Sequence, residues 1–136
     1  MRVVLDTNVL IAALLTRGTP PDRLYEAWRE GRFQLASCEQ QLEEINRVSR
    51  RPFLRERLTP GVAGRMVNDI RALALMCDPL PQVIVSSDPD DDFLLATAVA
   101  AGADYLVTGD KSGLLSLKKH GQTTILTARA LLKRFD

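Results

Sequence analysis

Residues 2–15 read RVVLDTNVLIAALL, an apolar run that is interrupted only by the polar set Asp6, Thr7 and Asn8. The first four residues are rich in β-branched side chains, which is typical of a short buried strand, and the apolar residues after Asn8 predict a buried helix. Asp6 therefore stands where the strand ends. The stretch predicts a strand that runs directly into a helix, with a carboxylate at the junction.

The same alternation of strand and helix continues through the rest of the chain. Further strands are predicted at residues 33–36, 82–85, 104–108 and 123–126, and helices at residues 19–31, 37–49, 59–77, 88–102, 110–121 and 128–135. The strands are short and apolar throughout, as are strands that are buried on both faces. We therefore predict an α/β fold with a parallel sheet of about five strands. Such sheets bind ligands outside the carboxyl ends of their strands, which is where Asp6 lies.

Length, charge and cysteine content narrow the class of protein. The 136 residues predict one domain, residues 1–136, with room for a substantial core. The 18 basic and 17 acidic residues nearly balance, so net charge gives no indication of a nucleic-acid partner. Cys38 and Cys77 lack a metal-type spacing, which favours a cytoplasmic protein with reduced thiols. The longest apolar run is too short for a bilayer, and the chain starts directly on a strand, so we expect neither a membrane span nor a signal peptide.

An unusual acidic stretch, SSDPDDDF, starts at residue 86. Asp88 before Pro89 is typical of a helix N-cap followed by proline in the first turn. Residues 90–92 are all aspartates and fall in that turn, where the helix dipole favours negative charge. Unit charges 4 Å apart repel by about 4 kcal/mol at an effective dielectric of 20, and a bound cation is one way to offset this. The helix is apolar almost all round, so its periodicity does not choose among the three.

Two more acids occupy suitable positions. Asp110 follows the predicted strand 104–108 after one glycine, in the sequence TGD. On the predicted helix 37–49, at about 100° per residue, Glu44 lies roughly 100° from the centre of the apolar stripe and Glu43 roughly 160° away. The stripe consists of Leu42, Ile45 and Val48. Glu44 can therefore lean over a cleft, whereas Glu43 faces solvent.

The candidate ligands are all carboxylates. The only histidine is His120, which we place on the surface, and no Ser/His/Asp set is present. A set of oxygen ligands without imidazole or thiolate suits Mg²⁺ or Mn²⁺ better than Zn²⁺. Catalysis by a metal-activated water is then the remaining route.

Three stretches resemble the PIN-domain ribonucleases: VVLDTNVLIAAL at residues 3–14, EEINRVSRRP at 43–52 and DPDDDFLLATAVAAGADYLVTGDKSGLL at 88–115. The similarity covers nearly the whole chain and is greatest to the small single-domain group identified as toxins of toxin–antitoxin pairs. It implies a three-layer sandwich with helices on both faces of the parallel sheet. It also implies a Mg²⁺- or Mn²⁺-dependent endoribonuclease, a hydrolase that cuts RNA phosphodiester bonds.

The resemblance also implies roles for individual residues. The catalytic and metal-binding acids would be Asp6, Glu44, Asp92 and Asp110. Supporting roles would fall to Thr7 and Asn8, which would orient Asp6 or a metal-bound water, and to Asp91 and Thr108. Lys111 and Ser112 stand where many members carry another acid, so the resemblance does not support a second, fully ligated metal.

The resemblance implies an RNA substrate, a small antitoxin partner and a homodimer. Arg50, Arg51 and Lys111 are candidate phosphate contacts. A solvated helix end or loop is an equally good interpretation, because Glu56 interrupts the basic run. Residues 15–28, which include Leu24, Tyr25 and Trp28, are either a protein interface or part of the core.

Three alternative functions rank below the nuclease. One is a catalytically inactive PIN-like module that binds RNA. Another is a phosphoacceptor signalling domain, which needs its acceptor acid after a central strand near the middle of the chain. The last is a haloacid-dehalogenase-type phosphatase, which needs an acid two residues after its nucleophile, where this chain has Asn8.

Overall fold

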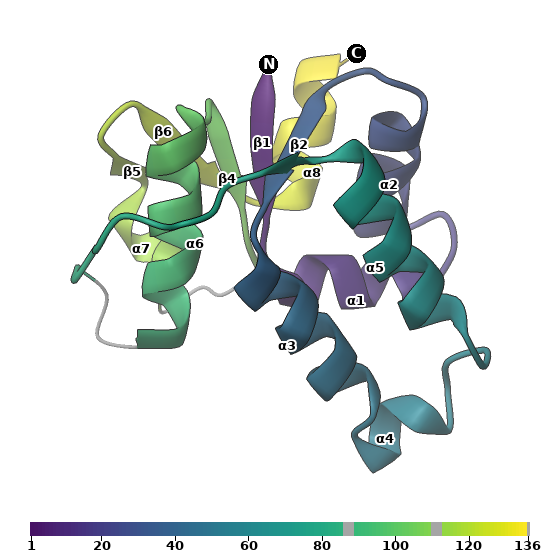
Figure 1. The fold of residues 1–136 in the computed structure, drawn as a ribbon. Helices are drawn as coiled ribbons and strands as arrows, with labels where there is room; N and C mark the ends of the chain where they lie inside the picture. Colours follow the sequence, from purple (N-terminus) through teal and green to yellow (C-terminus); the bar gives the residue numbers. More distant parts are fainter. Residues whose placement is uncertain (86–88, 110–112, 136) are drawn as a thin grey trace.

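The computed structural model describes residues 1–85, 89–109 and 113–135 (Figure 1). Within them the strands form a six-stranded sheet in the order β3-β2-β1-β4-β6-β5. The strands are β1 (Arg2–Leu5), β2 (Gln34–Ser37), β3 (Leu75–Met76), β4 (Tyr105–Val107), β5 (Lys119–His120) and β6 (Thr123–Leu126). Neighbouring strands are parallel except for β5 and β6, which are antiparallel. The predicted parallel sheet is confirmed, with one antiparallel strand added at its edge.

The helices cover both faces of this sheet. They are α1 (Thr7–Leu15), α2 (Pro20–Arg29), α3 (Glu39–Ser49), α4 (Pro52–Arg55), α5 (Val62–Leu73), α6 (Pro89–Ala101), α7 (Leu114–Leu117) and α8 (Ala128–Leu132), followed by the 3₁₀ turn Lys133–Phe135. In Figure 1, α6 and α7 lie on one side of the sheet, whereas α1, α2, α3, α5 and α8 lie on the other. This is the predicted three-layer α/β sandwich. In the described ranges no helix combines the length and the apolar character needed to cross a membrane.

The alternation of side chains along each strand separates the core into two halves. Val3 and Leu5 of β1 belong to the half that is built with α1, α2, α3, α5 and α8, and Val4 belongs to the half that contains α6 and α7. Neighbouring β4 divides in the same way, with Val107 on one side and Leu106 on the other. Because both faces are buried, the strands read as continuous apolar runs.

The third strand is not where the sequence predicts it. Residues 82–85 form no regular structure, and β3 is the short segment Leu75–Met76, which was predicted as the end of a helix. β3 pairs with β2 and so occupies that edge of the sheet. Pro79 and Pro81 follow, and proline lacks the N–H that a strand interior needs.

Two predicted faces also change. The spacing of Val62, Met66, Ile70 and Leu73 in the predicted helix 59–77 predicts one buried stripe. Leu73 does not follow it and is 61% exposed at the end of α5. Leu24 and Trp28 are buried, so the interface interpretation of residues 15–28 is wrong for these two side chains. Tyr25 beside them is partly buried and packs edge-on against Trp28, with ring centroids 5.3 Å apart. Burial raises the pKa of Tyr25 to about 12.

Candidate active site

The strand order places a topological switch point between β1 and β4. β1 pairs with β2 on one side and with β4 on the other, so the chain leaves β1 toward one edge of the sheet and later crosses over to the opposite side. Ligands of open α/β sheets bind at such a switch point, outside the carboxyl ends of the strands. Asp6 follows β1 and Thr108 follows β4. The fold therefore brings together two polar residues that are 102 positions apart in the chain.

Asp6 is buried and held by several donors. Its side chain is 7% exposed, and its Oδ2 accepts a hydrogen bond of 2.7 Å from the Thr108 hydroxyl. Its Oδ1 accepts the backbone N–H of Asn8 at 3.1 Å, which makes Asp6 the N-cap of α1. Its own N–H donates to the Val107 carbonyl at 2.8 Å, tying the residue to β4. Donors of this kind favour the carboxylate anion and fix its orientation.

A buried glutamine supports the neighbouring backbone. Gln41 is 1% exposed, and its Nε2 donates to the Leu5 carbonyl at 2.6 Å and to the Thr7 hydroxyl at 3.4 Å. The Ser37 hydroxyl donates to its Oε1 at 2.6 Å. Gln41 thus joins the ends of β1 and β2 to the first residue of α1.

The sequence analysis did not identify Gln41. Serine is a common capping residue, and Ser37 at the start of the predicted helix 37–49 is therefore expected to cap it. This expectation is wrong: the N-cap is Cys38, without a side-chain capping bond, and the Ser37 hydroxyl donates to Gln41 instead. The feature of the sequence that could have identified Gln41 is its position, one turn into a helix that directly follows a strand.

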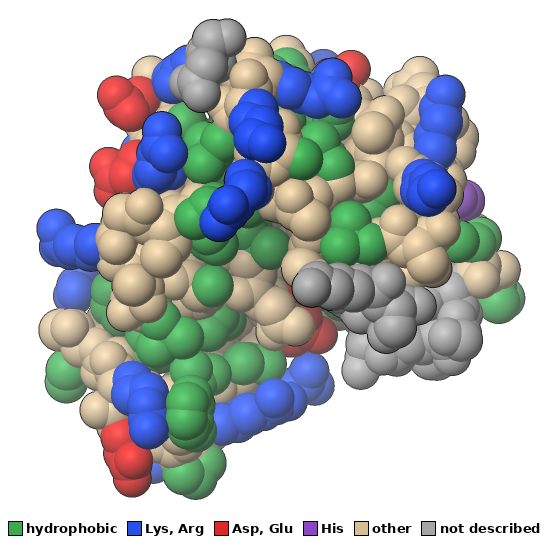
Figure 2. All heavy atoms as spheres, turned by 180° about the vertical axis from the view of Figure 1, so that it is seen from behind, with side chains coloured by type: hydrophobic (Ala, Val, Ile, Leu, Met, Phe, Trp, Pro, Cys, Tyr) green, Lys and Arg blue, Asp and Glu red, His purple; other side chains and the backbone are tan. Residues whose placement is uncertain are grey.

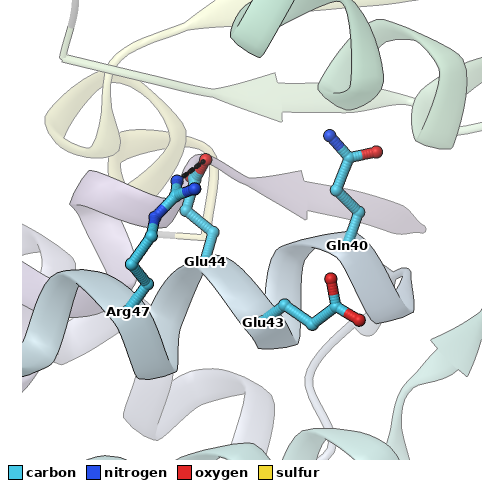
Figure 3. A pocket seen from close by; sticks show the side chains of 4 residues that line it. All are labelled: Gln40, Glu43, Glu44 and Arg47. Carbon is cyan, nitrogen blue, oxygen red and sulfur yellow. Dashed lines mark hydrogen bonds and ion pairs between the residues drawn. The ribbon is translucent and has the colours of Figure 1, made fainter.

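Glu44 lies on α3 beside a depression of about 710 Å³ that is lined by Gln40, Glu43, Glu44 and Arg47. Its carboxylate meets the Arg47 guanidinium at 3.5 Å, and the two side chains point toward one another while Glu43 diverges (Figure 3). The Glu44 side chain is 18% exposed and that of Arg47 is 67% exposed. Such an i,i+3 pair contributes only a few tenths of a kcal/mol. Arg47 is therefore a loosely held cation beside a candidate ligand, and the sequence analysis missed it.

The start of α3 is fixed by a second ion pair. Arg71 on α5 donates two hydrogen bonds to the Glu39 carboxylate, at 3.1 and 3.0 Å. These bonds lower the pKa of Glu39. Since α5 packs against α3, the pair restrains the helix that carries Gln41 and Glu44.

The first turn of α6 contributes Asp91 and Asp92, both partly buried. The backbone N–H of Val85 donates to Asp92 Oδ1 at 3.2 Å. α6 precedes β4 and covers the sheet, so its first turn lies toward the carboxyl ends of the strands. Asp88, Asp110 and Lys111 lie outside the described residues, as does the side chain of Asp90.

Some predicted residues meet in the structure and others do not. The Asp6 carboxylate accepts from the backbone of Asn8 and from the hydroxyl of Thr108, whereas the Thr7 hydroxyl accepts from Gln41. Among the described residues, no group of three or more His, Cys, Asp or Glu side chains is placed to hold a metal. Arg50 and Arg51 are exposed beyond the end of α3.

The two thiols have a structural place. Cys38 and Cys77 are both free and buried, and burial raises the pKa of each. The Cys77 N–H donates to the Ser37 carbonyl at 2.8 Å, which places the two cysteines close together, each directly after one of the neighbouring strands β2 and β3. Thiols with raised pKa stay protonated at neutral pH, so neither is suited to be a nucleophile.

Comparison with known proteins adds the family. A family model described as PIN domain matches residues 2–112, which include β1, the first turn of α6 and the end of β4. No curated protein and no solved structure is similar enough to the chain to count as a match. Because the matched residues make up well over half of the sequence, this chain belongs to the PIN-domain family, whose members are generally nucleases.

Proposed function

We propose that the protein is a metal-dependent endoribonuclease that hydrolyses RNA phosphodiester bonds. The observation that carries this is the geometry of Asp6, a buried carboxylate that Thr108 and Asn8 orient at the switch point of the sheet. A buried charge needs donors or a cation to remain ionised. The membership of a nuclease family supports the same conclusion.

The chemistry of the candidate metal ligands fits Mg²⁺ or Mn²⁺. Asp6, Glu44 and Asp92 offer carboxylate oxygens, and Asp110 would be the fourth acid of the set. The one imidazole of the chain belongs to His120 in β5, an edge strand, and both thiols are protonated and buried. Oxygen ligands alone favour a hard cation. When bound, such an ion would lower the pKa of a water and offset the charge of the phosphate.

The chain's own residues would prepare this site. Thr108 and Asn8 keep the Asp6 carboxylate in one orientation, so that it need not reorganise when the substrate arrives. Gln41 holds the backbone on either side of Asp6. Arg47 lies beside Glu44 with most of its side chain in solvent, where it can donate to a phosphate oxygen.

The test is cleavage of a mixed RNA pool by the purified chain in Mg²⁺, in Mn²⁺ and in EDTA. Asp6→Asn, Asp92→Asn and Glu44→Gln would be run beside the unchanged chain, with Glu43→Gln as the matched control on the same helix. We expect cleavage that needs metal, is lost in Asp6→Asn and Asp92→Asn, falls in Glu44→Gln and persists in Glu43→Gln. Cleavage that survives Asp6→Asn and Asp92→Asn would contradict the assignment.

A module that binds RNA without cutting it is the second candidate. The observation in its favour is that Arg50 and Arg51 are exposed beyond the end of α3, where they can contact phosphates without a metal. The same assay decides, because folded protein that binds RNA and cuts none of the pool in either metal would support this alternative.

The toxin role is a finer proposal. It is supported by the resemblance of the motifs to the small toxins, which implies a small antitoxin partner and a homodimer. The cysteine content favours a cytoplasmic protein. Induced expression should then arrest growth, and Asp6→Asn should relieve the arrest. Normal growth at high levels of soluble, RNA-cleaving protein would contradict a toxin role.

A further inference from the structure

The helix after the candidate active site ends in a basic surface that carries one aromatic ring. α4 is a single turn, Pro52–Arg55, anchored by the buried Leu54, and its neighbour Phe53 is 61% exposed. Among the described residues, Phe53 is the only aromatic side chain in the set of exposed large apolar ones. We call Phe53 with Arg50, Arg51, Arg55 and Arg57 the α4 platform.

The ring of Phe53 is already stacked with a cation. The Arg57 guanidinium carbon lies 3.7 Å from the ring centroid, and Arg57 Nη1 donates to the Phe53 carbonyl at 2.7 Å. The two groups therefore hold each other in a fixed stack. Aromatic rings and guanidinium planes are both surfaces on which unpaired nucleobases stack. The exposed part of the Phe53 ring leaves room for such a base.

The arginines that neighbour Phe53 in the chain are largely unneutralised. In the described part of the chain, the ion pair of the platform is Arg57 with Glu56 at 3.8 Å, and Arg50, Arg51 and Arg55 form none. The platform thus carries four arginines against one acid. Figure 2 shows Lys and Arg side chains next to hydrophobic ones at the end of the molecule where α4 lies. Positive charge beside an exposed ring favours a polyanion with aromatic bases over a protein partner.

The platform is connected to the acids by one helix. α3 carries Glu44 and Arg47 beside the acidic depression, and it leads directly to α4 (Figure 1). Eleven residues of helix span about 16 Å. An RNA strand that runs along α3 toward α4 would contact Arg47 first, then Arg50 and Arg51, and finally Phe53.

We propose that the α4 platform is a binding site for single-stranded RNA, in which a base stacks on Phe53 and the arginines contact the phosphates of the same strand. This names the substrate-binding element of the proposed nuclease and rests on that function for its biological meaning. A single strand is required because the bases of a duplex are stacked on one another and do not offer a free face.

The first experiment measures binding of a labelled oligouridylate by fluorescence anisotropy in EDTA, where metal-dependent cleavage is absent. Phe53→Ala should weaken binding about tenfold, as for the loss of one stacked base, and Phe53→Trp should preserve it. Leu73→Ala is the matched control, because Leu73 is also 61% exposed, on α5. A duplex of the same length should bind more weakly and should not respond to Phe53→Ala. Equal affinities of the unchanged chain and Phe53→Ala, or no binding by the unchanged chain, would overturn the proposal.

The second experiment tests the arginines through salt dependence. Arg50, Arg51 and Arg55 are changed together to Gln, and the control changes Arg17, Arg23 and Arg129, which are exposed and form no ion pair in the described residues. Three lost phosphate contacts should reduce the slope of log affinity against log salt by about 2. Equal slopes for the two triple variants would overturn the assignment of phosphate contacts to α4.

The outcomes separate this proposal from the nuclease itself. RNA binding that depends on Phe53, without cleavage in Mg²⁺ or Mn²⁺, would contradict the nuclease proposal and support the platform proposal. Metal-dependent cleavage by a chain whose Phe53→Ala variant binds RNA normally would contradict the platform proposal and support the nuclease proposal. If Phe53→Ala changes the sedimentation of the free chain and not its RNA affinity, the surface serves self-association and the proposal is wrong.

Discussion

A buried carboxylate keeps its charge only when donors replace the water that it has lost. For Asp6 these donors come from both sides of the switch point, because Thr108 belongs to the end of β4 and Asn8 to the start of α1. The hydrogen bond from Thr108 is the shorter one, at 2.7 Å, and joins two segments that are far apart in the chain. The hydroxyl of Thr108 is therefore expected to matter for stability as well as for the proposed catalysis.

The first prediction concerns this hydroxyl. Thr108→Val keeps the shape of the side chain and removes the donor, so the free energy of unfolding should fall by about 1.5–3 kcal/mol, the range for hydrogen bonds to charged groups. Thr108→Ser keeps the donor and should lose less than half as much. Urea denaturation in EDTA measures both variants, and equal stabilities of Val and Ser would show that the hydrogen bond contributes little.

The second prediction concerns Gln41. Gln41→Leu leaves the Leu5 carbonyl and the Ser37 hydroxyl buried without this partner. Each such group costs about 1–3 kcal/mol, so the free energy of unfolding should fall by about 2–6 kcal/mol. Gln40→Leu is the neighbouring control, because Gln40 is exposed and its replacement should change stability by less than about 0.5 kcal/mol. Similar denaturation midpoints for the two variants would contradict the role of the network.

Single residues differ in how far the sequence reveals them. Asp6 stands out because it is a carboxylate directly after an apolar run, which marks the carboxyl end of a predicted buried strand. Gln41 and Arg47 do not stand out, since a glutamine or an arginine on a helix is ordinarily a solvated residue. Their partners make them notable, and the Leu5 carbonyl is 36 positions from Gln41. Local pattern cannot supply a contact across that distance.

For whole strands and helices, too, local sequence does not reveal contacts with distant segments. Residues 82–85 have the composition of a strand, yet the edge of the sheet is occupied by Leu75–Met76, which reads as part of a helix. β-Propensity reports how well a side chain suits a half-buried pleated surface. It does not determine which of two segments pairs with the edge of the sheet. Ile84 is 78% exposed, so the apolar content of that segment does not become core. Asp6 and β1 were predictable because the first strand lies at the centre of the sheet.

A third prediction concerns the two thiols, which directly follow the neighbouring strands β2 and β3. Burial raises the pKa of Cys38 and Cys77 in the folded chain. The folded state therefore holds these protons more tightly than the unfolded state, and stability is lost as pH rises above the unfolded thiol pKa of about 8.5. We expect Tm to fall between about pH 8.5 and pH 10, and to fall less in the Cys38→Ala/Cys77→Ala variant. Parallel Tm–pH curves for the two proteins would contradict the assignment.

At the scale of the molecule, the sheet extends beyond the residues that define the family match. The match ends at residue 112, but β6 pairs with β4 and so lies inside the sheet, between β4 and β5. Leu131 of α8 is fully buried in the half of the core that also contains β1. Leu114 of α7 and Ile125 of β6 are buried in the other half. Both halves therefore depend on the last part of the chain.

The fourth prediction follows from this dependence: a chain ending at residue 112 should not fold. It lacks Leu114, Ile125, Leu126 and Leu131, each less than 9% exposed in the whole structure. At about 1.5–3 kcal/mol for each buried side chain, the loss is about 6–12 kcal/mol, which is comparable to the whole stability of a domain. It also leaves β4 as an unpaired edge. Circular dichroism and limited proteolysis should show an unfolded, rapidly digested chain.

The control removes only residues 133–136, where Phe135 stacks on Phe33 with ring centroids 5.9 Å apart, and should remain folded with a lower Tm. A cooperative thermal transition in the chain of residues 1–112 would mean that β1, β2 and β4 with α1 to α6 form a stable fold without β6, and the acids of the site would then need no support from the end of the chain.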